Sequence, residues 1–288
     1  MSLDSMKEIF DLMAEKNKPF WEVVLEDDME TRQVTRNQSM AKMLLTWQAM
    51  ADAADSYTGR KRSVSGLVGG DGMKMRQYCI RGEALSGGYV SEVIAEALSM
   101  AESNACMRRI VAAPTAGACG VLPAVLLPLC KYEELSQHQL LEALYVASGI
   151  GAVIAYRACI AGASGGCQAE IGTASAMAAG ALVALRGGSG AQIGHAVAMA
   201  LKNLMGLVCD PVAGLVEIPC VKRNVIGAVN AVSVADMAMA GIEKPHPRGR
   251  SDRRHGRGRP PHAGGVPRDG AGRSGRHAHR TRYQKTDA

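Results

Sequence analysis

Three of the eight cysteines occupy positions where a thiol can act as a metal ligand. Cys167 follows two glycines in "GASGGCQAEIG" and opens a helical pattern, and Cys209 and Cys220 flank the turn-rich part of "LVCDPVAGLVEIPCVKRN". A thiol at a helix N-terminus is held more easily as the thiolate, which is the form that binds metal. The spacings of 42 and 11 residues match no common zinc motif. Two interpretations therefore stay open: a shared metal site, or small thiols that fill a core.

The elements that position these cysteines are predicted to be helices. Apolar residues recur at helical spacing through most of residues 1–243, and strand-like alternation is nearly absent. Gly- and Pro-rich loops are expected at residues 63–74 and 113–123. The predicted helices cover residues 3–17, 27–56, 88–107, 121–131, 136–160, 170–186, 190–206 and 224–241. The pattern predicts one all-α domain over residues 1–243, with Gly/Pro-rich loops at its active site.

The composition agrees with close-packed helices in a soluble protein. Apolar residues make up 47% of the chain but aromatic residues only 4%, and small side chains let helix backbones approach closely. The uncharged apolar runs 144–156 and 173–185 have 13 residues each, too few to span a bilayer. The first residues lack the features of a signal peptide. We expect a cytoplasmic protein with reduced or metal-bound cysteines and no membrane partner.

Residues 244–288 differ in kind from the rest of the chain. They carry 13 Lys and Arg against 3 Asp and Glu, whereas residues 1–243 carry 20 against 24. Without Leu, Ile, Phe, Met or Trp this tail cannot bury a core, so we predict that it is disordered. A basic arm can bind nucleic acid through phosphate neutralisation. An amino-acid sequence rich in Arg, Gly and Pro also arises when GC-rich coding sequence is translated out of frame. We therefore favour a frame shift as the origin of this tail and expect no nucleic-acid partner.

Four blocks carry a resemblance to a known family. They read "SGLVGGDG", "NACMRRIVAAPTAGACGVLPAVL", "GGCQAEIGTASAMAAGAL" and "LKNLMGLVCDPVAGLVEIPCVKRN". Together they resemble the iron–sulfur-dependent L-serine dehydratases, and most closely the alpha chain of the two-chain form, with similarity from residue 4 to Gly241. A shift of the reading frame by one base after Glu243 can give a tail sequence that contains "RETG" and "GGLAATPTG". Such a sequence resembles the C-terminal block of the same family. The resemblance therefore favours the out-of-frame interpretation of the tail.

The resemblance implies a role for the three thiols. In that family, cysteines at the positions of Cys167, Cys209 and Cys220 hold a 4Fe–4S cluster, and the fourth iron, without a protein ligand, acts as a Lewis acid. L-Serine would bind that iron through its carboxylate and hydroxyl and lose the α-proton and water. The resulting aminoacrylate would be hydrolysed by water to pyruvate and ammonia, without pyridoxal phosphate. We also expect a monovalent cation as a second cofactor.

The resemblance also implies that other groups of the chain bind the carboxylate and the ammonium group of the substrate. The segment "PTAGACG" offers Thr115 and the backbone at Gly117, "SGG" offers Ser164, and Lys222 and Arg223 are the cations nearest to the cysteines in sequence. Roles in turns or helix caps explain Thr115 and Ser164 equally well. The sequence does not choose between Lys222 and Arg223.

One catalytic group of the family has no counterpart in this chain. Its histidine stands in a block similar to Ser-Ser-His-Thr, whereas residues 1–243 hold only His138 and His195, both inside helical patterns where we expect structural roles. The family's beta subunit carries that block. The resemblance therefore implies a beta-subunit partner and an oligomeric enzyme that acts on L-serine.

Other interpretations stay open beside this one. The chain can be a non-catalytic metal-binding or scaffold protein whose cysteines hold zinc or nothing, or a family member that its altered C-terminus leaves non-functional. The loop "GLVGGDG" lacks the Lys-Ser/Thr of a phosphate-binding loop. We predict that it forms a tight turn near the active site or an ion-binding loop.

Overall fold

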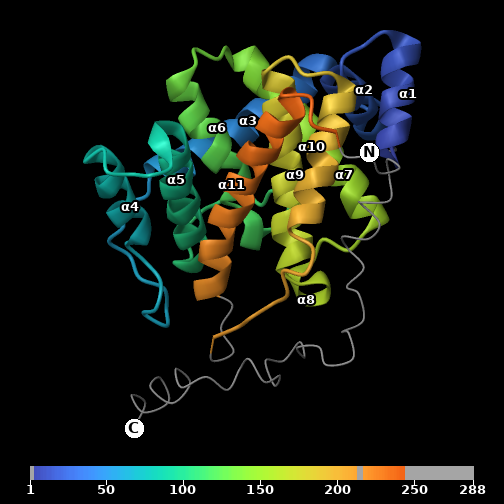
Figure 1. Ribbon diagram of the computed structural model, residues 1–288. Coiled ribbons are helices and arrows are strands. Elements are labelled where there is room, and N and C mark those ends of the chain that lie inside the picture. Colours follow the sequence, from blue (N-terminus) through green and yellow to red (C-terminus); the bar gives the residue numbers. More distant parts are fainter. Residues whose placement is uncertain (1–2, 213–216, 244–288) are drawn as a thin grey trace.

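Helices make up the regular structure of residues 3–212 and 217–243, the part of the chain that the computed structural model describes (Figure 1). No strand occurs within those two ranges, and the helices form one domain, which confirms the all-α prediction. The elements are α1 (Met6–Lys16), α2 (Phe20–Arg32), α3 (Arg36–Asp55), α4 (Asp71–Ile80), α5 (Gly87–Ala105), the 3-10 helix η1 (Ala116–Ala118), α6 (Val121–Tyr132), α7 (Gln137–Arg157), α8 (Gly162–Gly165), α9 (Cys167–Leu185), α10 (Gly190–Asn203) and α11 (Ile218–Met239).

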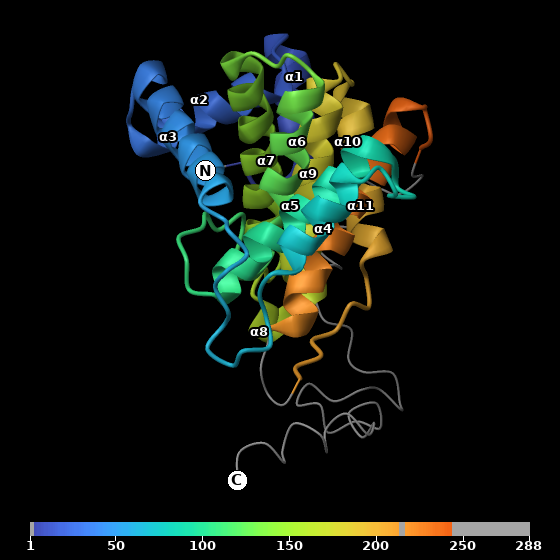
Figure 2. The ribbon, with the colours of Figure 1, turned by 90° about the vertical axis from the view of Figure 1, so that its left-hand side faces the viewer.

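Helix α9 runs through the centre of the fold. Fifteen of its nineteen residues are buried, and it packs against α6, α7, α10 and α11. A helix surrounded in this way needs small side chains, and most of its buried residues are Ala, Gly, Ser or Thr. In Figure 1, α9 lies between α7, α10 and α11. Helix α5 packs against α4, α6 and α11, and Figure 2 shows α4 and α5 across the front of the bundle.

Short sequence signals set the starts of three of these helices. Thr35, Ser136 and Ser189 each accept a hydrogen bond from the backbone N–H three residues later, where a glutamine side chain bonds back to the cap. This reciprocal capping box satisfies two backbone N–H groups that have no partner inside the helix. It explains why α7 and α10 begin within one residue of the positions that the sequence predicts.

Two predictions about element boundaries in the N-terminal half of the chain are wrong. The single helix expected at 27–56 is two helices, because Gln33 adopts a left-handed conformation (φ +54°) and Thr35 starts α3. The loop expected at 63–74 ends earlier, since α4 begins at Asp71 directly after Gly69 (φ +136°) and Gly70 (φ +84°). Positive φ angles suit these two glycines, so "GGDG" is the entry into a helix.

The helices near the cysteines also differ in extent from the prediction. Helix α9 begins three residues earlier than expected, at Cys167, and α11 begins six residues earlier, at Ile218. Helix α10 ends three residues earlier, at Asn203. As a result α9 and α11 begin, and α10 ends, at the same end of the bundle, the lower end in Figure 1.

Helix α7 contains the apolar run 144–156 but is longer than that run. With 21 residues it is long and apolar enough to cross a membrane by length and composition, which corrects the expectation from the run alone. In the fold, 67% of its apolar window is buried, and the helix packs against α2 and α9. Burial of this kind is typical of a core helix of a soluble protein.

Residues 244–288 lie outside the described residues. The expectation of a disordered, out-of-frame tail therefore stays a prediction.

The crossing of α9 and α11 leads to a test of the core. A Cβ added at Gly227 would lie 2.6 Å from Ile171 Cγ2 and 3.1 Å from Val121 Cγ2, both buried β-branched side chains. We expect Gly227→Ala to lower the free energy of unfolding by about 1–3 kcal/mol through overpacking, although alanine has the higher helix propensity.

Urea denaturation of Gly227→Ala and of Ser233→Ala measures this effect. Ser233 lies on the exposed face of the same helix, where a change of less than about 0.5 kcal/mol is expected. Equal midpoints for the two variants would contradict the close packing at Gly227.

Candidate active site

Cys167 is the first residue of α9, and its side chain is only 2% exposed. Gly166 precedes it at φ +75°, a conformation that glycine adopts without strain and that turns the short helix α8 into α9. The thiol therefore stands at the positive end of a long buried helix, where a negative charge is stabilised.

Cys209 lies in the segment after α10, and hydrogen bonds tie that segment to the first turn of α9. The Gln168 N–H donates to the Leu207 carbonyl at 2.8 Å, and the Gly206 N–H donates to Gln168 Oε1 at 2.9 Å. A Cβ at Gly166 would lie 3.3 Å from Cys209 N. Cys209 is thus held directly beside the start of α9.

Cys220 lies in the first turn of α11, and its thiol forms a hydrogen bond with the thiol of Cys167. The electrostatic influence of both Cys167 and Cys209 reaches Cys220. The fold therefore brings together three thiols that are far apart in sequence, at the end of the bundle where α9 and α11 begin and α10 ends (Figure 1).

Cys167 is the thiol that these contacts favour as a thiolate. The hydrogen bond from Cys220 and the one from Arg223 Nη1, at 2.9 Å, outweigh burial and lower the pKa of Cys167 to about 6. The pKa of Cys220 is raised, because its thiol donates to that thiolate and is buried beside it. Burial and the charge of Cys167 raise the pKa of Cys209. A metal that binds all three sulfurs must therefore displace protons.

The structure separates the two cations that the sequence offered. Arg223 Nη1 donates to Cys167 Sγ and, at 2.7 Å, to the Val208 carbonyl. Lys222 instead forms an ion pair with Asp71 at the start of α4, and its side chain is 53% exposed. Arg223 is thus the cation at the thiols, and Lys222 links α11 to α4.

A buried amide fastens the 114–120 loop to α11. Asn224 is 1% exposed; its Oδ1 accepts from the Gly120 N–H at 2.9 Å, and its Nδ2 donates to the Gly117 carbonyl at 2.8 Å and to the Cys220 carbonyl at 2.9 Å. One side chain therefore holds the glycine loop against the helical turn that carries Cys220. The sequence placed Asn224 inside the resemblance but offered no reason to single it out.

The other two predicted substrate contacts lie in different surroundings. Thr115 precedes η1, and its Oγ1 is buried without a hydrogen-bond partner among the described residues. Ser164 lies on α8, three residues before Cys167, and is exposed. No side-chain contact joins either hydroxyl to the thiols within the described ranges, so both assignments stay predictions.

Sequence reasoning missed one charged group at this site, Glu170. A Cβ at Gly162 would lie 2.3 Å from Glu170 Oε2, and one at Gly117 would lie 2.8 Å from the same atom. The carboxylate is therefore lodged between α8 and the 114–120 loop, and its charge acts to raise the pKa of Cys167 and Cys220. Its spacing of three residues from Cys167, which puts both on one helix face, is the signal that could have found it.

The loop "GLVGGDG" lies against a buried carboxylate of helix α5. Glu102, which is 1% exposed, accepts from the Asp71 N–H at 2.8 Å and the Gly72 N–H at 3.4 Å, and Tyr57 donates to it. The anion-binding position at the N-terminus of α4 is therefore filled from within the fold. The loop is a helix start tied to the site through the ion pair between Asp71 and Lys222.

Neither histidine of the body lies at the thiols. His138 pairs with Glu142 on α7 (3.1 Å) and packs edge-on against Trp21. His195 is in the second turn of α10, eight residues and about 12 Å of helix before the end of α10 that leads to Cys209.

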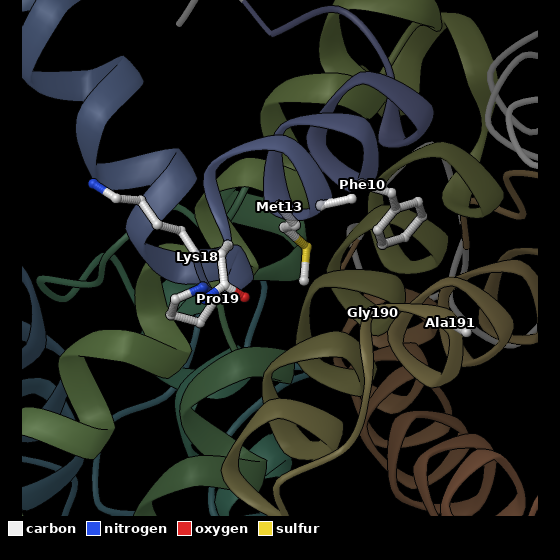
Figure 3. A pocket seen from close by; sticks show the side chains of 8 residues that line it. Phe10, Met13, Lys18, Pro19, Gly190 and Ala191 are labelled. Carbon is white, nitrogen blue, oxygen red and sulfur yellow. The ribbon is translucent and has the colours of Figure 1, made fainter.

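A cavity of about 490 Å³ also lies away from the thiols. Figure 3 shows it between Phe10 and Met13 of α1 and Gly190 at the start of α10. Since α10 ends near Cys209, this cavity is at the opposite end of that helix, and none of the predicted site residues lines it.

Comparison with known proteins identifies the family. A family model described as serine dehydratase alpha chain matches residues 15–250. The chain belongs to the serine dehydratase alpha-chain family. Among its relatives, a probable L-serine dehydratase alpha chain of Bacillus subtilis is 41% identical over 83% of this chain and 79% of its own, and an L-serine dehydratase alpha chain of Peptoniphilus asaccharolyticus is 37% identical over 84% and 83%.

Longer proteins are also similar to this chain over part of their length. An L-serine dehydratase 2 of Escherichia coli is 47% identical over 52% of this chain but only 33% of its own length. The resemblance predicted from the four sequence blocks is thus confirmed at the level of the family.

The buried amide of Asn224 leads to a test of how the serine dehydratase alpha-chain site is built. Asn224→Ala leaves the Gly120 N–H and two carbonyls without their partner, so we expect the free energy of unfolding to fall by about 2 kcal/mol or more. Asn203→Ala is the control, because that amide is exposed and bonds only Asn230 within the described residues. Thermal or urea unfolding of both variants gives the comparison, and equal losses would contradict the role of Asn224.

Proposed function

We propose that this chain is the alpha subunit of an iron–sulfur L-serine dehydratase, which converts L-serine into pyruvate and ammonia. The observation that supports the proposal is the meeting of Cys167, Cys209 and Cys220, from three separate segments, at one end of the bundle beside Arg223. The names of its relatives support the reaction and the substrate.

The donor set suits a 4Fe–4S cluster. Thiolates are the usual ligands of such clusters, and the hydrogen bonds from Cys220 and Arg223 lower the pKa of Cys167. A closed structural zinc site needs four protein ligands, whereas a cluster with an open iron needs the three cysteines alone. The thiols of Cys167 and Cys220 are in contact and must separate to bind different irons.

When bound, the cluster supplies a Lewis-acidic iron, because three thiolates leave one of four irons without a protein ligand. The chain's own groups have distinct tasks in this proposal. Arg223 holds Cys167 as a thiolate, and Asn224 fixes the loop whose backbone faces the site. Thr115 and Gly117 in that loop orient the substrate carboxylate, and Ser164 lies at the rim.

The base that accepts the α-proton is proposed to come from a beta subunit. No histidine lies at the thiols in the described part of the chain, where His138 pairs with Glu142 and His195 lies in the second turn of α10. A partner that closes the exposed end of the bundle would bring its own histidine to the substrate.

Metal analysis tests the proposal directly. After anaerobic purification we expect about four irons and four acid-labile sulfides per chain, and a change in the visible spectrum when L-serine is added. The same analysis of a chain with the reading frame restored after Glu243 separates a damaged C-terminus from a wrong assignment. Absence of iron from both forms would overturn the cluster proposal.

Matched cysteine variants sharpen that test. We expect Cys209→Ser to lose most of its iron, because serine is a poor ligand for such a cluster, whereas Cys79→Ser on α4 keeps it. Iron retention by Cys209→Ser at the level of Cys79→Ser would show that Cys209 is a core thiol.

Arg223 and Lys222 form a second matched pair. Arg223→Gln removes the contact to Cys167 Sγ, and groups that orient a metal ligand contribute about 10–100-fold to metal affinity. Lys222→Gln removes only an exposed ion pair with Asp71. We expect faster iron loss to a chelator from Arg223→Gln and an unchanged rate for Lys222→Gln, and the reverse order would contradict the assignment.

A further inference from the structure

Glu170 is the charged side chain whose surroundings the proposed cluster does not explain. Its carboxylate fits between Gly162 and Gly117, and at either position a Cβ would lie within 2.8 Å of Oε2. Any larger residue at 117 or 162 would displace the carboxylate. The fold therefore keeps two gaps in its side-chain packing that this one group occupies.

The carboxylate has no partner that would explain its position. Within residues 3–212 and 217–243, no hydrogen bond or ion pair is made by Glu170, although the residue is partly buried. The nearby cation, Arg223, donates to Cys167 and to the Val208 carbonyl instead. An ionised carboxylate can only accept hydrogen bonds, and the Glu170 oxygens are not among the fully buried polar atoms, so a donor can reach them. A cationic donor from outside the chain would satisfy it.

The location of Glu170 indicates which cation. It lies one helical turn after Cys167 on α9 and against Gly117 of the loop that Asn224 holds beside Cys220. It is thus between the thiol end of the bundle and the proposed substrate loop. Of the polar groups of L-serine, the α-ammonium is the one cation, and its three N–H donors match the carboxylate oxygens.

We propose that Glu170 binds the α-ammonium group of the amino-acid substrate. This inference rests on the proposed function. Glu170 then selects α-amino acids over hydroxy acids of the same shape, and Gly117 and Gly162 are glycines because the carboxylate and the ammonium need their space.

The test compares two ligands on the anaerobically purified, cluster-containing enzyme with its partner chain. L-Serine carries the ammonium, whereas 3-hydroxypropanoate has the same hydroxyl and carboxylate without it. Dissociation constants come from spectral titration, and iron content and melting temperature are measured on each variant. Glu170→Gln removes the charge at nearly constant shape, Glu170→Asp keeps the charge on a shorter side chain, and Glu217→Gln is the control at the start of α11.

A charge-assisted hydrogen bond contributes about tenfold or more to affinity. We expect Glu170→Gln to raise the dissociation constant of L-serine by at least that factor and to leave that of 3-hydroxypropanoate unchanged. The variant should also keep its iron. Glu170→Asp should retain part of the preference for L-serine, and Glu217→Gln should behave as the unmodified enzyme.

Two results would overturn the inference while leaving the proposed function intact. An equal rise in the dissociation constants of both ligands would show that Glu170 has a structural role. Loss of iron from Glu170→Gln would show that Glu170 acts on the cluster. If the unmodified, iron-loaded enzyme binds no L-serine, the proposed function itself fails.

Discussion

The burial of α9 on several sides is the constraint on which the rest of the structure depends. Four helices can approach it only because its buried residues are mostly Ala, Gly, Ser and Thr, with close fits such as Gly180 against Ile150. A helix so enclosed cannot carry polar chemistry along its length, since a buried polar group needs a partner. Chemistry is confined to its ends, and its N-terminal turn holds Cys167 and Glu170.

The polar contacts at that end follow from the same packing. Helix α11 lies along α9, so the first turn of α11 comes beside Cys167, and Asn224 and Arg223 point from it toward the glycine loop and the thiols. Each of these side chains joins two segments: Asn224 joins α11 to the loop before α6, and Arg223 joins α11 to the segment after α10. These two side chains therefore tie the first turn of α11 to the glycine loop and to the segment that carries Cys209.

The sequence predicts the helices better than it predicts the side chains between them. Periodicity and the Ser-x-x-Gln caps locate α7 and α10, but the break at Gln33 carries no glycine or proline and is therefore missed. The start of α4 is missed because the carboxylate that accepts from its first backbone N–H groups, Glu102, is distant in sequence. The cysteines stand out by type and context. Glu170 and Asn224 do not, because their importance comes from Gly162, Gly117 and Gly120, which only the fold brings near.

The charges at the thiol end explain why the proposed chemistry needs a second chain. Once deprotonated, the three sulfurs and the Glu170 carboxylate are all anions that accept hydrogen bonds. Arg223 already donates its hydrogen bonds to Cys167 Sγ and to the Val208 carbonyl. In the proposed arrangement this set holds iron and an ammonium group, and a carboxylate paired with an ammonium group is a weaker base than a free one. The half-buried thiols of Cys209 and Cys220 leave this end accessible. A proton acceptor can therefore reach the substrate from outside the bundle, as the proposed beta subunit requires.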